Sequence, residues 1–273
     1  MFVKPPDEDT EVTGVARLTK SMYGTRDAAQ CFDLFSEQTM HTLGFSSGVY
    51  NPCVYHSKVR DATCVRHGDD FVLLADRTTQ AWFHDELNKH MICKRLGVLG
   101  LRKQLGDVQE LRILNRLVRI VQPPYAAAGQ SYIEWEADPR HIEILVSAES
   151  LQPTSKGLTT PGLKQPPDAD LELLNDEAKT KFRSQAMRYA YLAHDRPDCQ
   201  FSAKELARAL NAPTHWHAQQ LRRAVRYLLD KGRVVQRFHQ QDMPTELVCY
   251  SDSDHAGCLT PRKSTSSSFC FWG

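Results

Sequence analysis

Hydrophobic residues recur every three or four positions in two segments of the first hundred residues, which predicts two amphipathic helices. The first helix is expected between Thr25, a capping residue, and Gly44, a stop signal. The second is expected to begin at a cap on Thr78 or Thr79. The apolar faces predicted to pack are Ala28, Cys31, Phe32 and Phe35 in the first helix and Trp82, Phe83 and Leu87 in the second.

Three short runs of β-branched and aromatic residues lie between these helices and predict strands at 53–56, 62–66 and 71–75. Gly68 lies between the last two runs, where a tight bend is expected. The order of helix, three strands and helix predicts an antiparallel sheet with helices on one face. This is an α+β arrangement.

The middle of the chain has a weaker pattern. Leu-Gly pairs recur between residues 96 and 106 and predict a tight hairpin, and residues 111–121 predict a strand. Residues 138–146 fit either a short helix or a strand. The polar segment 151–170 carries Pro and Gly and is expected to be a linker at a subdomain boundary.

Three further helical repeats follow, and their short connections predict a helical bundle. Asn175 is expected to cap the first helix and Gly232 to end the third. Two strands are expected after the bundle, at 247–250 and at a segment where Phe269 and Phe271 alternate. The inward residues predicted are Ala178, Phe182, Ala186 and Tyr189 or Ala190, then Ala203, Leu206, Ala207 and Leu210, and then Ala218, Leu221, Val225 and Leu228.

Composition excludes some classes of protein but does not identify a binding partner. The 273 residues carry a net charge of +1, so overall charge does not indicate a polyanionic or polycationic partner. The eight cysteines form no Cys-x-x-Cys pair, which argues against a zinc ribbon and a disulfide framework. The sequence has neither a signal peptide nor an apolar run of membrane-spanning length, so an intracellular location without membrane contact is expected.

Positive charge is nevertheless clustered locally. In segment 94–119 seven basic residues face two acidic ones, and segment 222–237 holds a second cluster. Each cluster has two interpretations, binding of nucleic-acid phosphates or a solvated helix face. Arg222 and Arg226 lie four residues apart and therefore on one side of their predicted helix.

Asp69 and Asp70 are predicted at the tip of the hairpin between strands 62–66 and 71–75. Two adjacent carboxylates repel each other, and a hard cation such as Mg²⁺ relieves that repulsion. Two-metal phosphoryl-transfer sites are built from such carboxylates. The alternative is an ordinary turn, in which Asp is common. Asp252 follows strand 247–250 and has the same two interpretations.

Several motifs then occur in a specific order. This order resembles the Pol polyprotein of copia-type LTR retrotransposons, from within the reverse transcriptase to the start of RNase H. The motifs are Leu18-Thr-Lys-Ser-Met-Tyr23-Gly24, Asn51-Pro-Cys-Val-Tyr55, Gly68-Asp69-Asp70, Leu105-Gly106, Arg196-Pro197-Asp198, Tyr250-Ser-Asp-Ser-Asp254-His-Ala-Gly257 and Arg262-Lys-Ser-Thr265.

The resemblance implies a fold and a division of the chain. Residues 1–110 would form part of a right-hand polymerase palm, and 111–170 a variable connector and linker. Residues 171–240 would form a thumb-like or connection-like helical bundle, and 245–273 the first, incomplete hairpin of an RNase H-like domain.

The resemblance also implies RNA-directed DNA polymerisation. Asp69 and Asp70 match the aspartates of the Tyr-x-Asp-Asp box, which would hold two Mg²⁺ ions, or Mn²⁺. Asp252 matches the first metal-binding aspartate of RNase H. The implied partners are an RNA/DNA primer-template, deoxynucleotides and the rest of the Pol polyprotein. The implied nucleic-acid contacts are Leu105 and Gly106, at the position of the primer grip, with Arg102, Lys103, Arg222 and Arg226.

The sequence also departs from the family pattern. His67 stands where the box has Tyr, and a third catalytic carboxylate is expected upstream of Met1. We therefore expect a polymerase-derived fragment that is inactive alone. Two alternatives remain open: a non-catalytic nucleic-acid-binding remnant that uses clusters 94–119 and 222–237, and a decayed product that barely folds.

Overall fold

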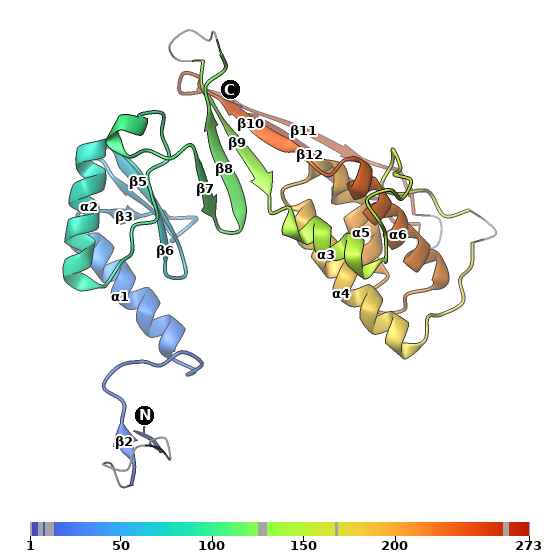
Figure 1. Cartoon of the computed structure of the whole chain (residues 1–273), viewed down its shortest axis with the longest axis horizontal. Coiled ribbons are helices and arrows are strands. Elements are labelled where there is room, and N and C mark those ends of the chain that lie inside the picture. Colours follow the sequence, from blue (N-terminus) through green and yellow to red (C-terminus); the bar gives the residue numbers. More distant parts are fainter. Residues whose placement is uncertain are drawn as a thin grey trace. The chain divides into compact units, whose positions relative to one another are not determined.

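A computed structural model describes residues 2–4, 8, 14–124, 130–166, 169–258 and 262–272. The chain forms two compact units, residues 1–96 and 97–273, which are described separately (Figure 1). The predicted palm extends to residue 110, beyond the boundary of the first unit. The four functional segments inferred from the sequence stay predictions.

The first unit contains a four-stranded antiparallel sheet in the order β3-β4-β5-β6, with α1 and α2 on one face (Figure 1). The predicted α+β order is confirmed for this unit. A separate pair of short strands, β1 and β2, precedes it. The bounds are β1 Phe2–Val3, β2 Ala16–Arg17, α1 Ala28–Thr42, β3 Ser46–Ser47, β4 Val54–Ser57, β5 Ala62–His67, β6 Asp70–Leu74 and α2 Arg77–His90.

Alternation along β5 decides which side chains enter the core of this unit. Ala62 and Cys64 are buried toward the helices, whereas Val65, one position on, is 40% exposed on the other face. Phe45 and Phe83 meet edge to face, with ring centroids 5.5 Å apart. The helices therefore shield one face of the sheet, and the other face remains open.

Two details of α1 were predicted wrongly. In α1 the buried residues are Ser36, Thr39 and Met40, while Cys31 and Phe35 are exposed. Ala28 and Phe32, four residues apart, are half-buried and in register with Ser36 and Met40, so the prediction was wrong for only two of its four residues. Thr25 does not cap α1, because its hydroxyl donates to the Met22 carbonyl in the preceding turn.

The cap of α2 is Asp76, not Thr78 or Thr79. The Asp76 carboxylate accepts hydrogen bonds from the Thr78 and Thr79 amides at 2.8 and 2.9 Å and from the Thr79 hydroxyl at 2.8 Å. These bonds, led by the Thr79 amide, lower the pKa of Asp76. A carboxylate at this position satisfies orphan amides and favours the positive end of the helix dipole.

The second unit combines an antiparallel sheet, in the order β10-β9-β8-β7, with helices α3 to α6 and a separate hairpin, β11–β12 (Figure 1). Two 3₁₀ turns, η1 and η2, complete it. The bounds are η1 Lys103–Leu105, β7 Glu110–Ile113, β8 Arg116–Val121, β9 Tyr132–Ala137, α3 Arg140–Ala148, α4 Asp176–Ala193, η2 Pro197–Cys199, α5 Gln200–Arg208, α6 His215–Asp230, β10 Val235–His239, β11 Leu247–Ser253 and β12 Ser266–Trp272.

The three helices predicted after the linker are confirmed as α4, α5 and α6. Asn175 caps α4 by accepting from the Ala178 amide at 2.9 Å. The predicted inward residues Phe182, Leu206 and Leu228 are at most 2% exposed. Helix α3 joins the same hydrophobic core through Leu145, so segment 138–146 is mainly helical.

The predicted strand 111–121 is instead a hairpin. Leu114 and Asn115 both have positive φ, at 48° and 62°, and separate β7 from β8. Asn is favoured in such a turn, but Leu is not, and the apolar Leu114 hid the turn in the sequence. The hairpin predicted at 96–106 is also wrong: this segment forms a loop that ends in η1, with Gly106 at φ 81°.

The linker is anchored to the bundle rather than separated from it. Among its described residues, the Leu158 amide donates to the Arg226 carbonyl at 3.3 Å, and the Leu163 amide donates to Gln220 Oε1 at 3.0 Å. Both partners lie on α6. The linker thus lies along α6 within the second unit. No helix in the described part of the chain is both long enough and apolar enough to span a bilayer.

Candidate functional site

Asp69 and Asp70 lie at the exposed tip of the β5–β6 hairpin, as predicted. His67 and Asp70 are the last paired residues, so Gly68 and Asp69 form a two-residue loop. Gly68 has φ 60°, a conformation that glycine adopts without a side-chain clash. The sequence folds this way because glycine falls between two strand-forming runs, and the carboxylates follow it directly.

Asp70 belongs to the open face of the sheet. Its neighbours on that face are Val72 and Leu74, two and four residues along β6, and His67 opposite it on β5. Leu74 is 76% exposed, whereas Phe71, on the alternate face, packs against the hydrophobic core of this unit. The carboxylate is therefore not covered by α1 or α2, and a ligand can reach it.

A buried arginine holds the hairpin tip in place. The Arg66 side chain is 7% exposed, and its Nη1 donates to Asp33 Oδ1 at 2.7 Å and to the Gly68 carbonyl at 3.2 Å. Desolvation opposes the charge of Arg66, but the bonds to Asp33 and Tyr55 outweigh it and raise the pKa of Arg66. Arg66 thus connects Gly68, the residue directly before the two aspartates, to α1, which carries Asp33.

The alternation along β5 indicates from the sequence that Arg66 is buried. In β5 the inward positions are Ala62, Cys64 and Arg66, so the arginine falls in register with buried residues. A charged residue in such register needs a partner. The partner, Asp33, is 33 residues earlier in the chain, and no local pattern identifies it.

The donor set at the tip fits a magnesium ion in part. Asp69 and Asp70 supply oxygen donors, which Mg²⁺ prefers, and it is commonly held by one or two carboxylates together with substrate phosphates and water. In the described residues no three His, Cys, Asp or Glu side chains come together as a metal site. The residues present therefore suit a site that is completed by substrate rather than a closed protein cage.

The predicted primer-grip residues lie around η1 in the second unit. Arg102, Lys103 and Leu105 are exposed, and Gly106 closes the turn with its amide donating to the Lys103 carbonyl at 3.0 Å. In the described residues neither Arg102 nor Lys103 forms an ion pair. Both remain available for phosphate contact.

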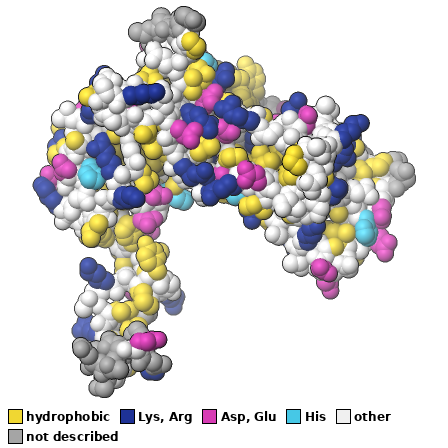
Figure 2. Space-filling view, in the orientation of Figure 1, with side chains coloured by type: hydrophobic (Ala, Val, Ile, Leu, Met, Phe, Trp, Pro, Cys, Tyr) yellow, Lys and Arg dark blue, Asp and Glu magenta, His cyan; other side chains and the backbone are white. Residues whose placement is uncertain are grey.

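Three of the other arginines of cluster 94–119, Arg112, Arg116 and Arg119, pair with carboxylates. Arg112 Nη1 lies 2.6 Å from Asp138 Oδ2, and Arg116 Nε lies 3.0 Å from Asp195 Oδ2. Arg119 pairs with two glutamates, Glu110 and Glu136. Figure 2 shows basic and acidic side chains interspersed over this part of the surface. Compensated arginines of this kind weaken the interpretation of the cluster as a phosphate-binding surface.

Arg222 contacts the end of α3, and Arg226 contacts the linker. Arg222 Nη1 donates to the Glu149 carbonyl at 2.7 Å, and Arg226 Nε donates to the Lys156 carbonyl at 2.8 Å. These two arginines do lie outside the apolar face of α6, as predicted. Both guanidinium groups, which were expected to contact phosphates, thus donate to backbone carbonyls of the chain itself.

Asp252 is part of strand β11, opposite Ser267 of β12, and is exposed. The two predicted strands are confirmed. On the same face Tyr250 and Phe271 meet edge to face at 6.0 Å between ring centroids. Every residue of both strands is exposed, so the described hairpin presents aromatic groups to solvent.

Comparison with known proteins agrees with the resemblance seen in the sequence. The chain is 24% identical over 275 residues to a retrovirus-related Pol polyprotein from transposon RE1 of Arabidopsis thaliana. It is similar to part of a retrotransposon Pol polyprotein. The alignment covers 95% of this chain but 16% of the relative's length. No family model matches the chain, and no solved structure does.

Proposed function

We propose that this chain is part of a retrotransposon RNA-directed DNA polymerase, in which Asp69 and Asp70 hold divalent metal at the primer terminus. The observation that carries the proposal is their position, because two adjacent aspartates lie exposed at a hairpin tip beside the open face of a helix-backed sheet. The similarity to a Pol polyprotein selects this function among those that use paired carboxylates.

Each residue at the tip then has a defined task. Asp70 is fixed by its place in the β5–β6 ladder, and Asp69 by the two-residue loop. Arg66 restrains the loop through the Gly68 carbonyl, so the carboxylates need little rearrangement on binding metal. Asp69 and Asp70 would hold Mg²⁺, whose charge would favour ionisation of a primer 3′ hydroxyl and offset the negative charge of the leaving pyrophosphate. The face that carries Asp70 is covered by neither α1 nor α2.

The partners follow from this chemistry. The phosphates of a deoxynucleoside triphosphate would supply metal ligands in addition to the two carboxylates. We therefore propose an RNA/DNA primer-template and deoxynucleotides as substrates, and further parts of a Pol polyprotein as partners. The proposed origin is a copia-type element, and the proposed extent runs from the palm to the start of RNase H, where Asp252 would hold metal.

Titration with Mn²⁺, followed by electron paramagnetic resonance, tests the metal site. The wild-type chain should bind Mn²⁺ weakly, more tightly when a primer-template and a deoxynucleotide are present, and Mg²⁺ should compete. Asp69→Asn with Asp70→Asn should abolish this binding. Asp61→Asn is the matched control, because Asp61 lies in the exposed β4–β5 turn at φ 45°, which Asn also tolerates. Equal Mn²⁺ binding by all three proteins would contradict the proposal.

A further inference from the structure

The linker runs antiparallel to α6 and contacts it on both sides of Thr160. The amides of Leu158 and Leu163 donate to groups of α6 at 3.3 and 3.0 Å, as described above. Between these two contacts, Arg223 Nη2 of α6 donates to Thr160 Oγ1 at 2.6 Å. The Thr160 hydroxyl is thus held opposite an arginine by contacts on either side of it.

Arg223 has a donor without a partner. Its Nε is buried, yet it makes no hydrogen bond with any described residue. Within the described part of the chain Arg223 forms no ion pair either. Buried polar atoms are nearly always paired, so an unpaired guanidinium nitrogen needs an explanation.

The geometry of the guanidinium indicates which partner is missing. Nε and Nη2 lie on one edge of a planar group and can bind two oxygens of the same acceptor. Arg196 binds Asp198 in this way, through Nε at 3.0 Å and Nη2 at 2.7 Å. The hydroxyl of Thr160 offers a single oxygen to Arg223, so half of the donor pair stays unused. A group with several oxygens at Thr160 would engage both nitrogens.

The sequence around Thr160 suits the enzymes that add such a group. Thr160 is followed by Pro161, and proline-directed protein kinases require a proline directly after the acceptor residue. Proline also biases the preceding residue toward an extended backbone, the form in which kinases bind their acceptor segments. Thr160 is exposed and belongs to no helix or strand, and the backbone of residues 159–162 makes no hydrogen bond with the described residues. A kinase can therefore bind this segment without breaking secondary structure.

Charge also favours a phosphate at this position. Residues 151–166 contain Lys156 and Lys164 and no acidic residue. The sole acidic residue of α6 is Asp230, at its last position, where it lies beside Gly157 rather than Thr160. A phosphothreonine carries a charge of about −1.5 to −2 at pH 7. It would meet arginine on α6 without a carboxylate between the two groups.

We propose that Thr160 is a phosphorylation site for a proline-directed serine/threonine kinase, and that the phosphothreonine binds the Nε–Nη2 edge of Arg223 and fastens the linker to α6. The kinase transfers the γ-phosphoryl group of ATP. A bond forms between Thr160 Oγ1 and phosphorus, the bond from phosphorus to ADP breaks, and the hydroxyl proton passes to the base of the kinase. The inference goes beyond the proposed function and does not depend on the metal site.

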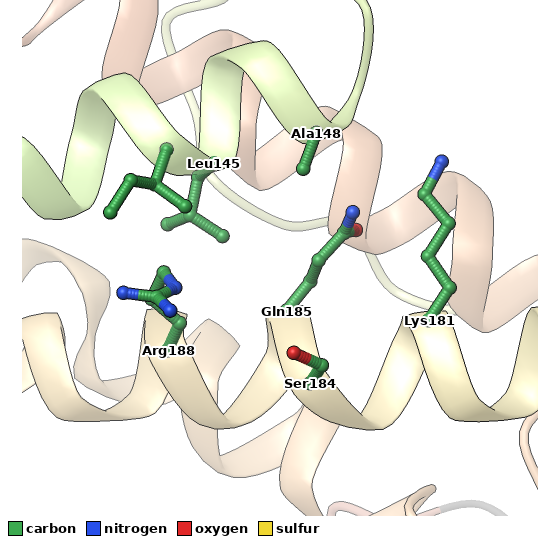
Figure 3. Close-up of a pocket in the computed structure, with 7 residues that line it drawn as sticks. Leu145, Ala148, Lys181, Ser184, Gln185 and Arg188 are labelled. Atoms are coloured by element: carbon green, nitrogen blue, oxygen red, sulfur yellow. The ribbon is translucent and has the colours of Figure 1, made fainter.

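Other cations of the second unit lie at a separate surface. Lys181 and Arg188 project from α4 into a shallow groove between α3 and α4 (Figure 3). No described residue of the linker lines this groove. Arg188→Gln therefore removes an arginine from the helical bundle without touching the linker, and it is the matched control for Arg223→Gln.

Incubation of the full chain with a proline-directed kinase and ATP tests the site. All proteins carry Thr260→Ala, because the other Thr-Pro step, Thr260-Pro261, lies outside the described residues. We expect a mass increase of about 80 Da, the mass of one phosphoryl group, located on Thr160 by tandem mass spectrometry and absent in Thr160→Ala. Thr159→Ala is the control, because Thr159 is exposed but is not followed by proline, and it should be modified like the parent chain. An unmodified Thr160 in the full chain, whether or not a peptide of residues 154–166 is modified, would overturn the proposal.

Two measurements on the phosphorylated chain test the contact with Arg223. A neighbouring guanidinium favours the phosphate dianion, so the pKa of phosphothreonine from a ³¹P NMR titration should be lower than in the phosphorylated peptide. Arg223→Gln should remove this difference, and Arg188→Gln should keep it. Phosphorylation should also slow proteolysis within residues 151–166 about fivefold, and this protection should be lost in Arg223→Gln. A phosphothreonine that titrates as in the peptide, or equal protection in Arg223→Gln, would refute binding by Arg223.

Discussion

The fully buried Arg196 is the most demanding electrostatic feature of the second unit. Its side chain is 1% exposed and donates to Asp198 through Nε and Nη2 at 3.0 and 2.7 Å. It also donates to the carbonyls of Lys231 and Gly232 at 2.9 and 3.3 Å, which connects the start of η2 to the end of α6. Tyr227 donates to Asp198 as well, at 2.7 Å.

Asp198→Ala should therefore be strongly destabilising. Burial opposes the ionised carboxylate, but the bonds from Arg196 and Tyr227 outweigh it and lower the pKa of Asp198. Removal of Asp198 leaves a buried guanidinium without its counter-ion, which costs about 3–5 kcal/mol in the free energy of unfolding. Because Asp198 itself is 25% exposed, we expect about 3 kcal/mol, the lower end of that range.

Urea unfolding followed by tryptophan fluorescence measures this loss. A Trp82→Phe background removes the one tryptophan of the first unit, so the signal reports the second unit. Asp176→Ala is the control, because its ion pair with Lys179 is exposed and worth about 0–1 kcal/mol. If Asp198→Ala unfolded at the same urea concentration as the control, the buried pair would have no special role in this unit.

Three further predictions follow from single contacts. Burial lowers the pKa of His217, whose Nδ1 accepts from the Thr214 amide at 3.2 Å. The stabilisation that neutral His217 contributes is therefore complete above pH 6.5 and is lost as the pH falls below it. His217→Gln should make the melting temperature depend less on pH over this acid range. Cys249 and Cys270 lie opposite each other with their sulfurs 2.7 Å apart. Glutathione disulfide should therefore convert the two thiols to one disulfide and release two molecules of reduced glutathione. The intact mass of the protein should fall by about 2 Da, and Cys249→Ser should prevent this change. Arg226→Ala removes the hydrogen bond to the Lys156 carbonyl, so it should speed proteolysis within residues 151–166. The same variant should bind an RNA–DNA hybrid as tightly as the wild-type chain. A large loss of binding would instead support the predicted contact between Arg226 and phosphate.

The sequence predicted those elements whose signals are local. Helix α4 has a capping Asn175 and one apolar stripe, so its start and buried face were both predicted correctly. The α2 cap was wrong because Asp76 and two threonines compete within four residues, and the carboxylate is the stronger acceptor. The turn between β7 and β8 was missed because Leu114 is not a turn former.

In the candidate site, too, the locally encoded part was predictable and the part that depends on long-range contacts was not. Its tip was predictable, because Gly68 stands between two strand patterns and the aspartates come next. Its support was not, since Arg66 finds Asp33 only in the folded chain. The same limit applies to the basic clusters: Arg116 pairs with Asp195, 79 residues away, and local charge counting cannot detect such compensation.

The central claim, that Asp69 and Asp70 hold divalent metal, is tested most directly by mapping the ion on the chain. Fe²⁺ in place of Mg²⁺, with ascorbate and peroxide, generates hydroxyl radicals that cut the backbone next to the bound ion. We expect cleavage confined to the β5–β6 tip, around residues 67–71, that excess Mg²⁺ suppresses and the Asp69→Asn, Asp70→Asn double variant lacks. Cleavage elsewhere, or the same cleavage in the double variant, would contradict the assignment of these two aspartates.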